Sequence, residues 1–281
     1  MGNSNIQTIL NCPFLPQSLV APADAAGEDF DALALTLTQA QADNATLQNQ
    51  ISALQAQIAA AANVKVFDGL ELTPWTVAGG SAANSSGNTG VAGDAQSIPT
   101  DKNAFLQILP NGLAFANKYW YKNRPGDATK KTYDYEGLLM LPTAADCAAS
   151  QAIELDIEQR ISGTCFNVGF QWDFAEKVLR VWNRSASTPT VPHGWQSIGV
   201  SLARWAPLSW HSFKLEAHRD DSSVHYDAAT VDGNRIDLSG LSFPAIQLNE
   251  PDCMNNALQL DANSAGAAYL MYIDQIRLAV A

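Results

Sequence analysis

The stretch "AIELDIEQ", residues 152–159, alternates apolar and polar side chains with a period of two. In an extended strand the carboxylates of Glu154, Asp156 and Glu158 would share one face, opposite three aliphatic side chains. The pattern therefore predicts a half-buried β-strand. Because like charges in a row cost free energy, the acidic face needs an explanation. It could be a catalytic row, a polar ligand site or a solvated surface.

Similar short strands, separated by turn residues, follow from residue 64 to the end of the chain. "VDGN", 231–234, predicts a tight hairpin, and the Gly/Ser/Asn-rich stretch 73–101 predicts a loop or a poorly packed edge. No convincing second helix is expected in this part. Many short strands at even spacing predict a mainly β fold, a jelly-roll β-sandwich over 64–281.

An N-terminal helix precedes this domain. Apolar residues recur in steps of three and four over 29–63, a heptad seam with Asn44 at one of its inner a positions. The flanks are rich in Gln and Ala, so the segment 29–62 predicts self-association, either as a dimer or as a trimer. The alternative is one amphipathic helix lying on its own β-domain. Residues 1–28 predict an irregular arm.

The composition excludes several partners. The 281 residues carry a net charge of −12, and no basic cluster is present to meet phosphates, so nucleic acid is not an expected partner. No apolar run is long enough for a membrane span. The first residues lack the pattern of a signal peptide, and we expect an extracellular or secreted protein whose signal has been removed.

The order of several segments carries a resemblance to a known superfamily. "ELDIEQ", "VGFQWD", "VWNR", "WHSFKLEAHRDDSSVHY", "TVDGNRI" and "YIDQIRL" follow one another over 64–281. In this order they resemble the concanavalin A-like lectin/glucanase jelly roll, most of all an uncharacterised branch of bacterial secreted proteins. The resemblance implies a jelly-roll fold and a glycan as ligand or substrate.

Glu154, Asp156 and Glu158 also resemble the Glu-x-Asp-x-Glu signature of family-16 glycoside hydrolases. By that resemblance Glu154 would be the nucleophile, Asp156 would tune it and Glu158 would be the general acid/base. A retaining enzyme needs two carboxyl groups about 5–5.5 Å apart. Residues i and i+4 of a strand lie roughly 13 Å apart at Cα, so this chemistry requires a strongly curved sheet.

Ligand binding without cleavage is the preferred interpretation of the same face. We expect "FNVGFQWDF", 166–174, to pair antiparallel with the acidic strand. Gln171 would then adjoin Glu154 and Asp156, with Gln159 as an alternative amide, and such groups bind sugar hydroxyls. Arg180 and Trp182 alternate on the next strand. Trp182 could stack on a sugar ring or pack in the core.

The remaining candidates carry weaker signals. At least one ring of the run Tyr119, Trp120 and Tyr121 should face outward, and His211 and His225 are expected to be structural. The four cysteines, Cys12, Cys147, Cys165 and Cys253, show no metal-ligand spacing; one disulfide or buried free thiols are open alternatives. No cofactor is expected. Calcium on scattered aspartates, such as Asp232, Asp261 or Asp274, has no specific motif behind it.

Three functions follow in order of preference. The first is a lectin-like protein that binds a polysaccharide or glycan and is presented as an oligomer on a coiled-coil stalk. The second is a retaining glycoside hydrolase acting on a β-glucan-like polysaccharide. The third is a structural fibre or surface-assembly protein.

Overall fold

The computed structural model describes residues 30–78, 85–92, 102–184 and 194–281. The predicted arm 1–28 with Cys12 lies outside the described residues, as do 79–84 and 93–101 of the predicted loop. Ala60–Ala281 forms a compact unit by itself.

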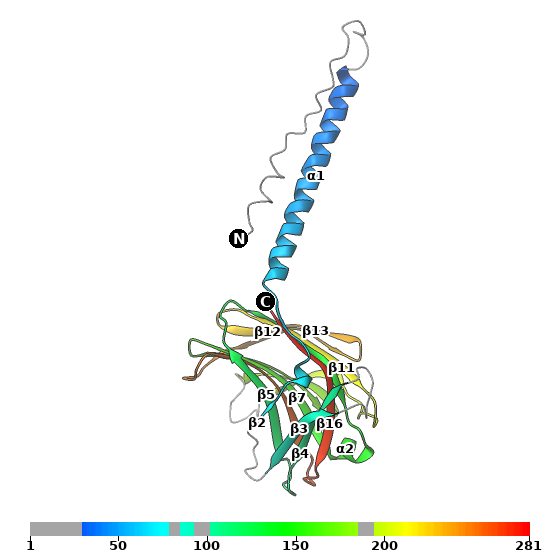
Figure 1. Cartoon of the computed structure of the whole chain (residues 1–281), viewed down its shortest axis with the longest axis vertical. Helices are drawn as coiled ribbons and strands as arrows, with labels where there is room; N and C mark the ends of the chain where they lie inside the picture. Colours follow the sequence, from blue (N-terminus) through cyan, green and yellow to red (C-terminus); the bar gives the residue numbers. More distant parts are fainter. Residues whose placement is uncertain (1–29, 79–84, 93–101, 185–193) are drawn as a thin grey trace. The chain divides into compact units, whose positions relative to one another are not determined.

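Helix α1 spans Phe30–Ala62 (Figure 1). Two of its apolar side chains at inner heptad positions, Leu47 and Leu54, are 55% and 56% exposed. The helical conformation predicted for this segment is observed. The pairing of this helix with another copy of the chain stays a prediction. None of the described helices is long and apolar enough to cross a membrane.

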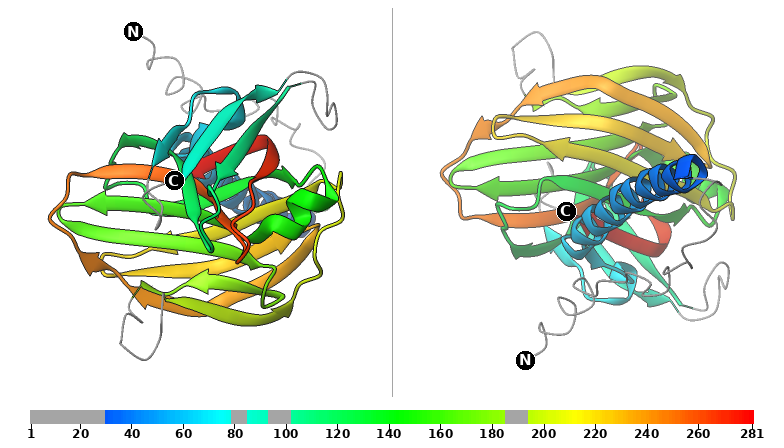
Figure 2. Two further views of the ribbon diagram at one scale, coloured as in Figure 1. Left: turned by 90° about the horizontal axis from the view of Figure 1, so that it is seen from below. Right: turned by 90° about the horizontal axis from the view of Figure 1, so that it is seen from above.

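The β-domain consists of two antiparallel sheets, each with eight strands in the described part of the chain (Figures 1 and 2). The back sheet has the order β13 (Asn234–Pro244), β12 (Ser223–Val231), β11 (His211–Arg219), β6 (Thr132–Met140), β16 (Tyr269–Val280), β4 (Asn103–Leu109) and β3 (Ser86–Ala92), with β1 (Lys65–Phe67) beside β16. The front sheet has the order β10 (Trp195–Ser201), β9 (Val178–Trp182), β8 (Thr164–Asp173), β7 (Ser150–Ile161), β15 (Cys253–Ala262), β5 (Asn117–Pro125) and β2 (Thr76–Ala78), with β14 (Ile246–Gln247) beside β8. A short 3-10 helix, η1, spans Leu70–Leu72.

The chain crosses repeatedly between the two sheets. Strands β4, β5, β6 and β7 lie alternately in the back and front sheets, and β15 returns to the front sheet before β16 closes the back one. Such crossings between two antiparallel layers are typical of jelly-roll sandwiches. The mainly β class and the two-sheet sandwich are thereby confirmed.

The core lies between the sheets and is built from the inward-facing side chain of every second residue. Trp172 on β8 is fully buried and meets the rings of Trp205 and Phe213 edge-on at centroid distances of 5.7 and 6.0 Å. Burial of one such side chain stabilises the fold by roughly 1.5–3 kcal/mol. The other face of each front-sheet strand is left for polar residues, and this division positions the site.

Local signals explain several turns and edges. Asp232 and Gly233 both have positive φ, 50° and 76°, so "VDGN" forms the predicted hairpin between β12 and β13. The glycine-rich β3 is the edge strand of the back sheet.

The prediction that no second helix follows the first was wrong. A short helix, α2 (Ala144–Ala149), begins at a capping box formed by Thr143 and Asp146.

The three cysteines of the β-domain are buried free thiols. Cys253 and Cys165 both pair with Arg160, from opposite sides of β7, so a whole strand separates them. Two strand spacings of about 4.8 Å place their Cα atoms beyond the reach of a disulfide. The alternative of a disulfide in this domain is therefore wrong.

Candidate functional site

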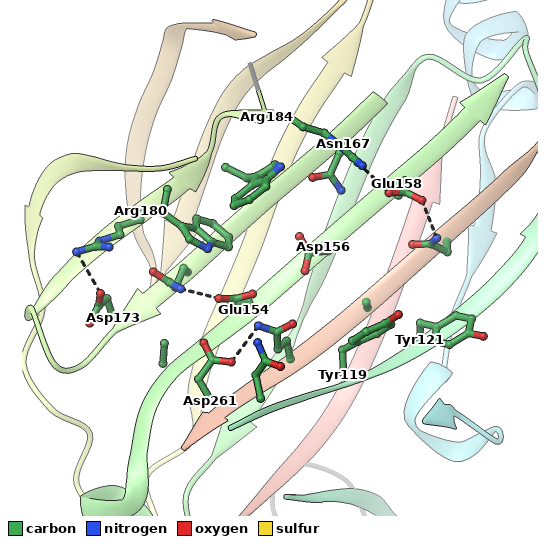
Figure 3. A pocket seen from close by; sticks show the side chains of 18 of the residues that line it. Tyr119, Tyr121, Glu154, Asp156, Glu158, Asn167, Asp173, Arg180, Arg184 and Asp261 are labelled. Carbon is green, nitrogen blue, oxygen red and sulfur yellow. Dashed lines mark hydrogen bonds and ion pairs between the residues drawn. The ribbon is translucent and has the colours of Figure 1, made fainter. Parts of the chain in front are cut away.

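A groove of about 990 Å³ lies over the outer face of the front sheet. Its floor is made by alternate residues of β5, β7, β8, β9 and β15 (Figure 3). On β7 these are Glu154, Asp156 and Glu158, because their aliphatic neighbours fill the core. The row of carboxylates inferred from the sequence is therefore the centre of a groove.

The strand register places small residues on both sides of Asp156. Asp156 pairs with Gly169 on β8 and with Ala257 on β15, and Ala257 pairs in turn with Tyr121 on β5. A Cβ atom at Gly169 would lie 2.8 Å from Asp156 Oδ1 and 2.9 Å from Trp182 Cβ. Glycine at position 169 therefore lets the Asp156 carboxyl group and Trp182 pack directly against the backbone of β8.

Glu154 is buried and hydrogen-bonded to two neighbouring side chains. Its side chain is only 6% exposed, and Gln171 Nε2 donates to its Oε1 at 2.6 Å. Burial, followed by the charges of Asp261 and Asp156, raises its pKa well above the usual value, and Glu154 also hydrogen-bonds to Asp261.

Asp261 is held at the same floor from strand β15. Gln259 Nε2 donates to its Oδ1 at 2.9 Å. Burial raises the pKa of Asp261 to about 6, although its hydrogen bonds with Glu154 and Gln259 oppose the shift. Gln171, Glu154, Asp261 and Gln259 thus form one chain of hydrogen bonds across three strands.

Asp156 is the member of the row that has no such partner. In the described parts of the chain, no donor makes a hydrogen bond to its carboxyl group, and none is drawn to it in Figure 3. Burial raises its pKa to about 7, with further contributions from the charges of Glu158 and Asp261. A carboxyl group in this state can accept hydrogen bonds from a ligand.

Glu158 is ion-paired at the far end of the row. Arg160 Nε donates to its Oε1 at 2.6 Å, and Arg184 Nη1 lies 3.1 Å from its Oε2. Asn255 Nδ2 makes a longer contact of 3.4 Å. Two guanidinium groups thus hold this carboxylate by charge-assisted contacts, one at each oxygen. They occupy the oxygens that a general acid/base would present to a substrate.

Aromatic side chains border the groove on two sides. Trp182 on β9 and Trp195 on β10 meet at a centroid distance of 5.1 Å, and both line the groove. Tyr119 and Tyr121 on β5 line it from the opposite side, whereas Trp120 between them is buried in the core. The alternation predicted for this run is confirmed.

Four residues that line the groove carry a buried polar atom without a protein partner in the described chain. They are Gln151 Oε1, Gln171 Oε1, Arg180 Nε and Trp182 Nε1. Arg180 is otherwise paired with Asp173, whose Oδ2 lies 3.2 Å from Arg180 Nη2. Buried polar atoms normally have a partner, so these atoms indicate a polar ligand or ordered water.

The six site residues predicted from sequence, Glu154, Asp156, Glu158, Gln171, Arg180 and Trp182, all line this groove. Gln159 was a wrong alternative. It faces the core and accepts a hydrogen bond of 2.6 Å from Tyr133 Oη. In the alternation of β7 it lies on the same side as the apolar residues. Sequence analysis missed Arg184 and the contribution of β15. The stretch "NNALQLDA", 255–262, does alternate polar and apolar residues, but this alternation does not indicate with which strand it pairs.

The other candidates have structural contacts. Asp232 accepts the backbone N–H of Ser212 at 2.9 Å and contacts His211, and His225 contacts Asp220. Within the described ranges, no three His, Cys, Asp or Glu side chains are arranged to hold a metal ion. Calcium binding by Asp232, Asp261 or Asp274 therefore has no cluster to support it there.

No protein family and no curated protein matches the sequence. Among solved structures, an endo-β-1,4-glucuronan lyase from the fungus Trichoderma reesei has 10% identity and a TM-score of 0.49, covering 76% of this chain and 94% of the lyase. Peanut lectin has 9% identity and a TM-score of 0.44, with 78% and 98% covered. A carbohydrate esterase of the Shiga toxin-encoding bacteriophage phi24B has 17% identity and a TM-score of 0.42, with 73% and 89% covered.

A lectin and a polysaccharide lyase are thus among the structures to which this chain is similar. The Glu-x-Asp-x-Glu signature gains no support from them. At identities this low, ligand and activity have to be argued from the groove itself.

Proposed function

We propose that the front-sheet groove binds a neutral glycan. The single observation that carries this proposal is Asp156, a largely buried carboxyl group that lines the groove without a hydrogen-bond donor in the described chain. Sugar hydroxyls are donors of the right kind, and Trp182 and Tyr121 line the groove on either side of the acidic row to stack on a ring.

The charges of the groove favour a neutral ligand over an acidic one. Its three arginines already have carboxylate partners: Arg160 and Arg184 pair with Glu158, and Arg180 pairs with Asp173. A uronate or phosphate would have to displace one of these pairs. A neutral sugar leaves them in place and uses the free lone pairs of the Asp156 carboxyl group and Gln171 Oε1.

Hydrolysis by Glu154 and Glu158 is the second candidate, and the site favours it less. Glu158 is clamped by two arginines, and Glu154 is hydrogen-bonded to Gln171 and Asp261. Both carboxyl groups of the hydrolase hypothesis are thus engaged by other side chains of the protein. Binding without cleavage therefore fits the contacts better.

Self-association through residues 29–62 completes the proposal. The exposed apolar side chains of α1 repeat at inner heptad positions, and Asn44 at an a position is suited to set the register of copies. Several grooves on one stalk would raise the apparent affinity for a repetitive polysaccharide. The acidic, weakly charged composition fits presentation outside the cell. A purely structural fibre remains the third function.

The test screens the full chain on a panel of neutral and acidic polysaccharides, measuring both retention and released reducing ends. Asp156→Asn should weaken retention by roughly tenfold to a hundredfold, because it removes a charge-assisted acceptor. Gly169→Ala should weaken it too, because the new Cβ would lie 2.8 Å from Asp156 Oδ1 and displace that carboxyl group. Gly240→Ala is the matched control, since a Cβ there meets nothing within 4 Å.

Three results would contradict the proposal. Reducing ends released by the wild type but not by Glu154→Gln or Glu158→Gln would establish the hydrolase instead. Retention of acidic polysaccharides alone would overturn the neutral ligand. Retention of no polysaccharide, with Asp156→Asn indistinguishable from wild type, would remove the groove as a glycan site.

A further inference from the structure

Phe115 lies at one end of the groove and is not explained by the fold. It precedes β5, whose first residue, Asn117, pairs with Asp261, and Asp261 pairs with Ala152. All four residues line the groove. Phe115 is 58% exposed, and its ring makes no contact with another aromatic ring or a cation in the described parts of the chain.

The backbone of Phe115 is held in a conformation that a bulky residue disfavours. Its φ is +56°, in the left-handed region, where a Cβ atom crowds the following carbonyl oxygen. The loop is nevertheless well anchored. Phe115 N–H donates to Asn263 O at 3.1 Å, and the carbonyl of Ala116 accepts from Ala262 N–H at 2.8 Å.

The turn that anchors this loop approaches it very closely. A Cβ atom at Gly266 would lie 2.6 Å from the carbonyl carbon of Gly112, so only glycine permits the contact. The turn and the loop therefore hold Phe115 rigidly, at a cost in backbone strain and with its ring in solvent. Strained residues of this kind cluster at sites that contact ligands.

A polar acceptor accompanies the ring. Gln151 lines the same end of the groove, and its Oε1 is buried without a protein partner in the described chain. An exposed aromatic face and an unsatisfied amide oxygen at the same end of a groove can together hold a sugar, by stacking and by one hydroxyl hydrogen bond.

This end of the groove is distinct from the part that Asp156 lines. Ala152 and Asp156 are four residues apart on β7, which corresponds to roughly 13 Å along the strand. One pyranose ring cannot reach both places. A ligand that uses both must be a chain of linked sugars.

We propose that Phe115 and Gln151 form a terminal subsite that makes the groove specific for an oligosaccharide or polysaccharide chain over a single sugar. The inference rests on the proposed binding of neutral glycans by the same groove. Phe115 is then a specificity-determining residue, and the length of the bound chain is the property it controls.

The experiment measures affinities of the full chain for neutral cello-, xylo-, manno- and laminari-oligosaccharides, each from disaccharide to hexasaccharide. Wild-type affinity should rise with chain length. Phe115→Gly should lower the affinity for the longest ligands by about tenfold and leave that for disaccharides within about twofold. Phe115→Trp should retain the length dependence, because it keeps an aromatic face.

Leu208→Gly is a matched control. Leu208 is also apolar, 61% exposed and left-handed, with φ of +61°, but it does not line the groove. Both glycine variants relieve the same backbone strain, so both should fold at least as well as wild type. Only Phe115→Gly should change binding.

The outcomes separate this inference from the proposed function. If oligosaccharides bind and Asp156→Asn weakens them, while Phe115→Gly leaves the length dependence unchanged, the terminal subsite is wrong and the groove stands. If Leu208→Gly alters binding as much as Phe115→Gly, the subsite is also overturned. If no oligosaccharide binds the wild type, both proposals fail.

Discussion

Asp156 owes its character to the different partners of its two neighbours in the row. Glu154 is hydrogen-bonded to Gln171 and Asp261, and Glu158 is paired with Arg160 and Arg184. Within the described chain, Asp156 is the carboxyl group of the row that receives no hydrogen bond, and this is the physical basis of its proposed role.

The first prediction concerns pH and Asp156. Its pKa is raised from 3.8 to about 7, first by burial, so the folded chain binds this proton more tightly than the unfolded chain. The stabilisation is present below about pH 4 and is lost as the pH rises to about 7. Asp156→Asn should thus be more stable than wild type at pH 8, by about 2–4 kcal/mol at most, and nearly equal at pH 4. Urea unfolding at both values measures the difference.

For comparison, Asp237→Asn should change the pH dependence of stability in the opposite direction. Hydrogen bonds from the backbone and side chain of Ser239 lower the pKa of this exposed carboxylate. Its stabilisation is present above the unfolded pKa and is lost as the pH falls, so this variant should be the less stable one at pH 8. An Asp156→Asn variant that also loses stability at pH 8 would show that the Asp156 charge is compensated by a contact.

At the scale of elements, one core tyrosine ties the back sheet to the floor of the groove. Tyr226 on β12 reaches across the interior, and its hydroxyl contacts the N–H and carbonyl of Gly169 at 2.9 and 3.0 Å. It also donates to Trp182 O at 2.9 Å. The hydroxyl thus joins β8 and β9 at Gly169, which pairs with Asp156, and at Trp182, which borders the groove.

Tyr226→Phe should therefore act on both stability and binding. It leaves buried backbone groups of Gly169 and Trp182 without this partner, which costs about 1–3 kcal/mol. The release of β9 should also weaken glycan retention. Tyr272→Phe is the control, because the described chain offers its hydroxyl no hydrogen bond, and it should change stability by less than about 0.5 kcal/mol. Urea unfolding measures the stability of both variants. Equal losses of stability would argue against a special role for Tyr226.

At the scale of the whole molecule, the prediction is self-association of the full chain through α1. Leu47→Glu with Leu54→Glu should shift sedimentation to the monomer, because charges replace two exposed apolar side chains of the heptad seam. Asn49→Glu with Ala56→Glu adds the same charge at outward heptad positions and should leave the oligomer intact. Asn44→Ile should change the distribution of oligomers and not abolish them. A wild-type chain that sediments as a monomer would remove the stalk from the proposal.

The sequence by itself determined the strands and the facing of their side chains. A period of two is a local property, so the alternation of residues 152–159 was enough to place Glu154, Asp156 and Glu158 on one face and their aliphatic neighbours in the core. The adjacent strand β8 was predictable as well, because only a two-residue turn separates it from β7. Gln171 could therefore be assigned to the site before its hydrogen bond with Glu154 was known.

Only the tertiary structure decided which distant strands complete the groove. Strand β15 pairs with β7 across about a hundred residues of chain, and any alternating strand satisfies the local pattern equally well. That pairing brings Asp261 to Glu154 and Ala257 to Asp156, and so determines which carboxyl group gains a hydrogen-bonded partner from β15 and which does not. The exposed ring of Phe115 depends likewise on the turn at Gly266. Protonation and exposure are properties of three-dimensional neighbours, which a linear pattern does not specify.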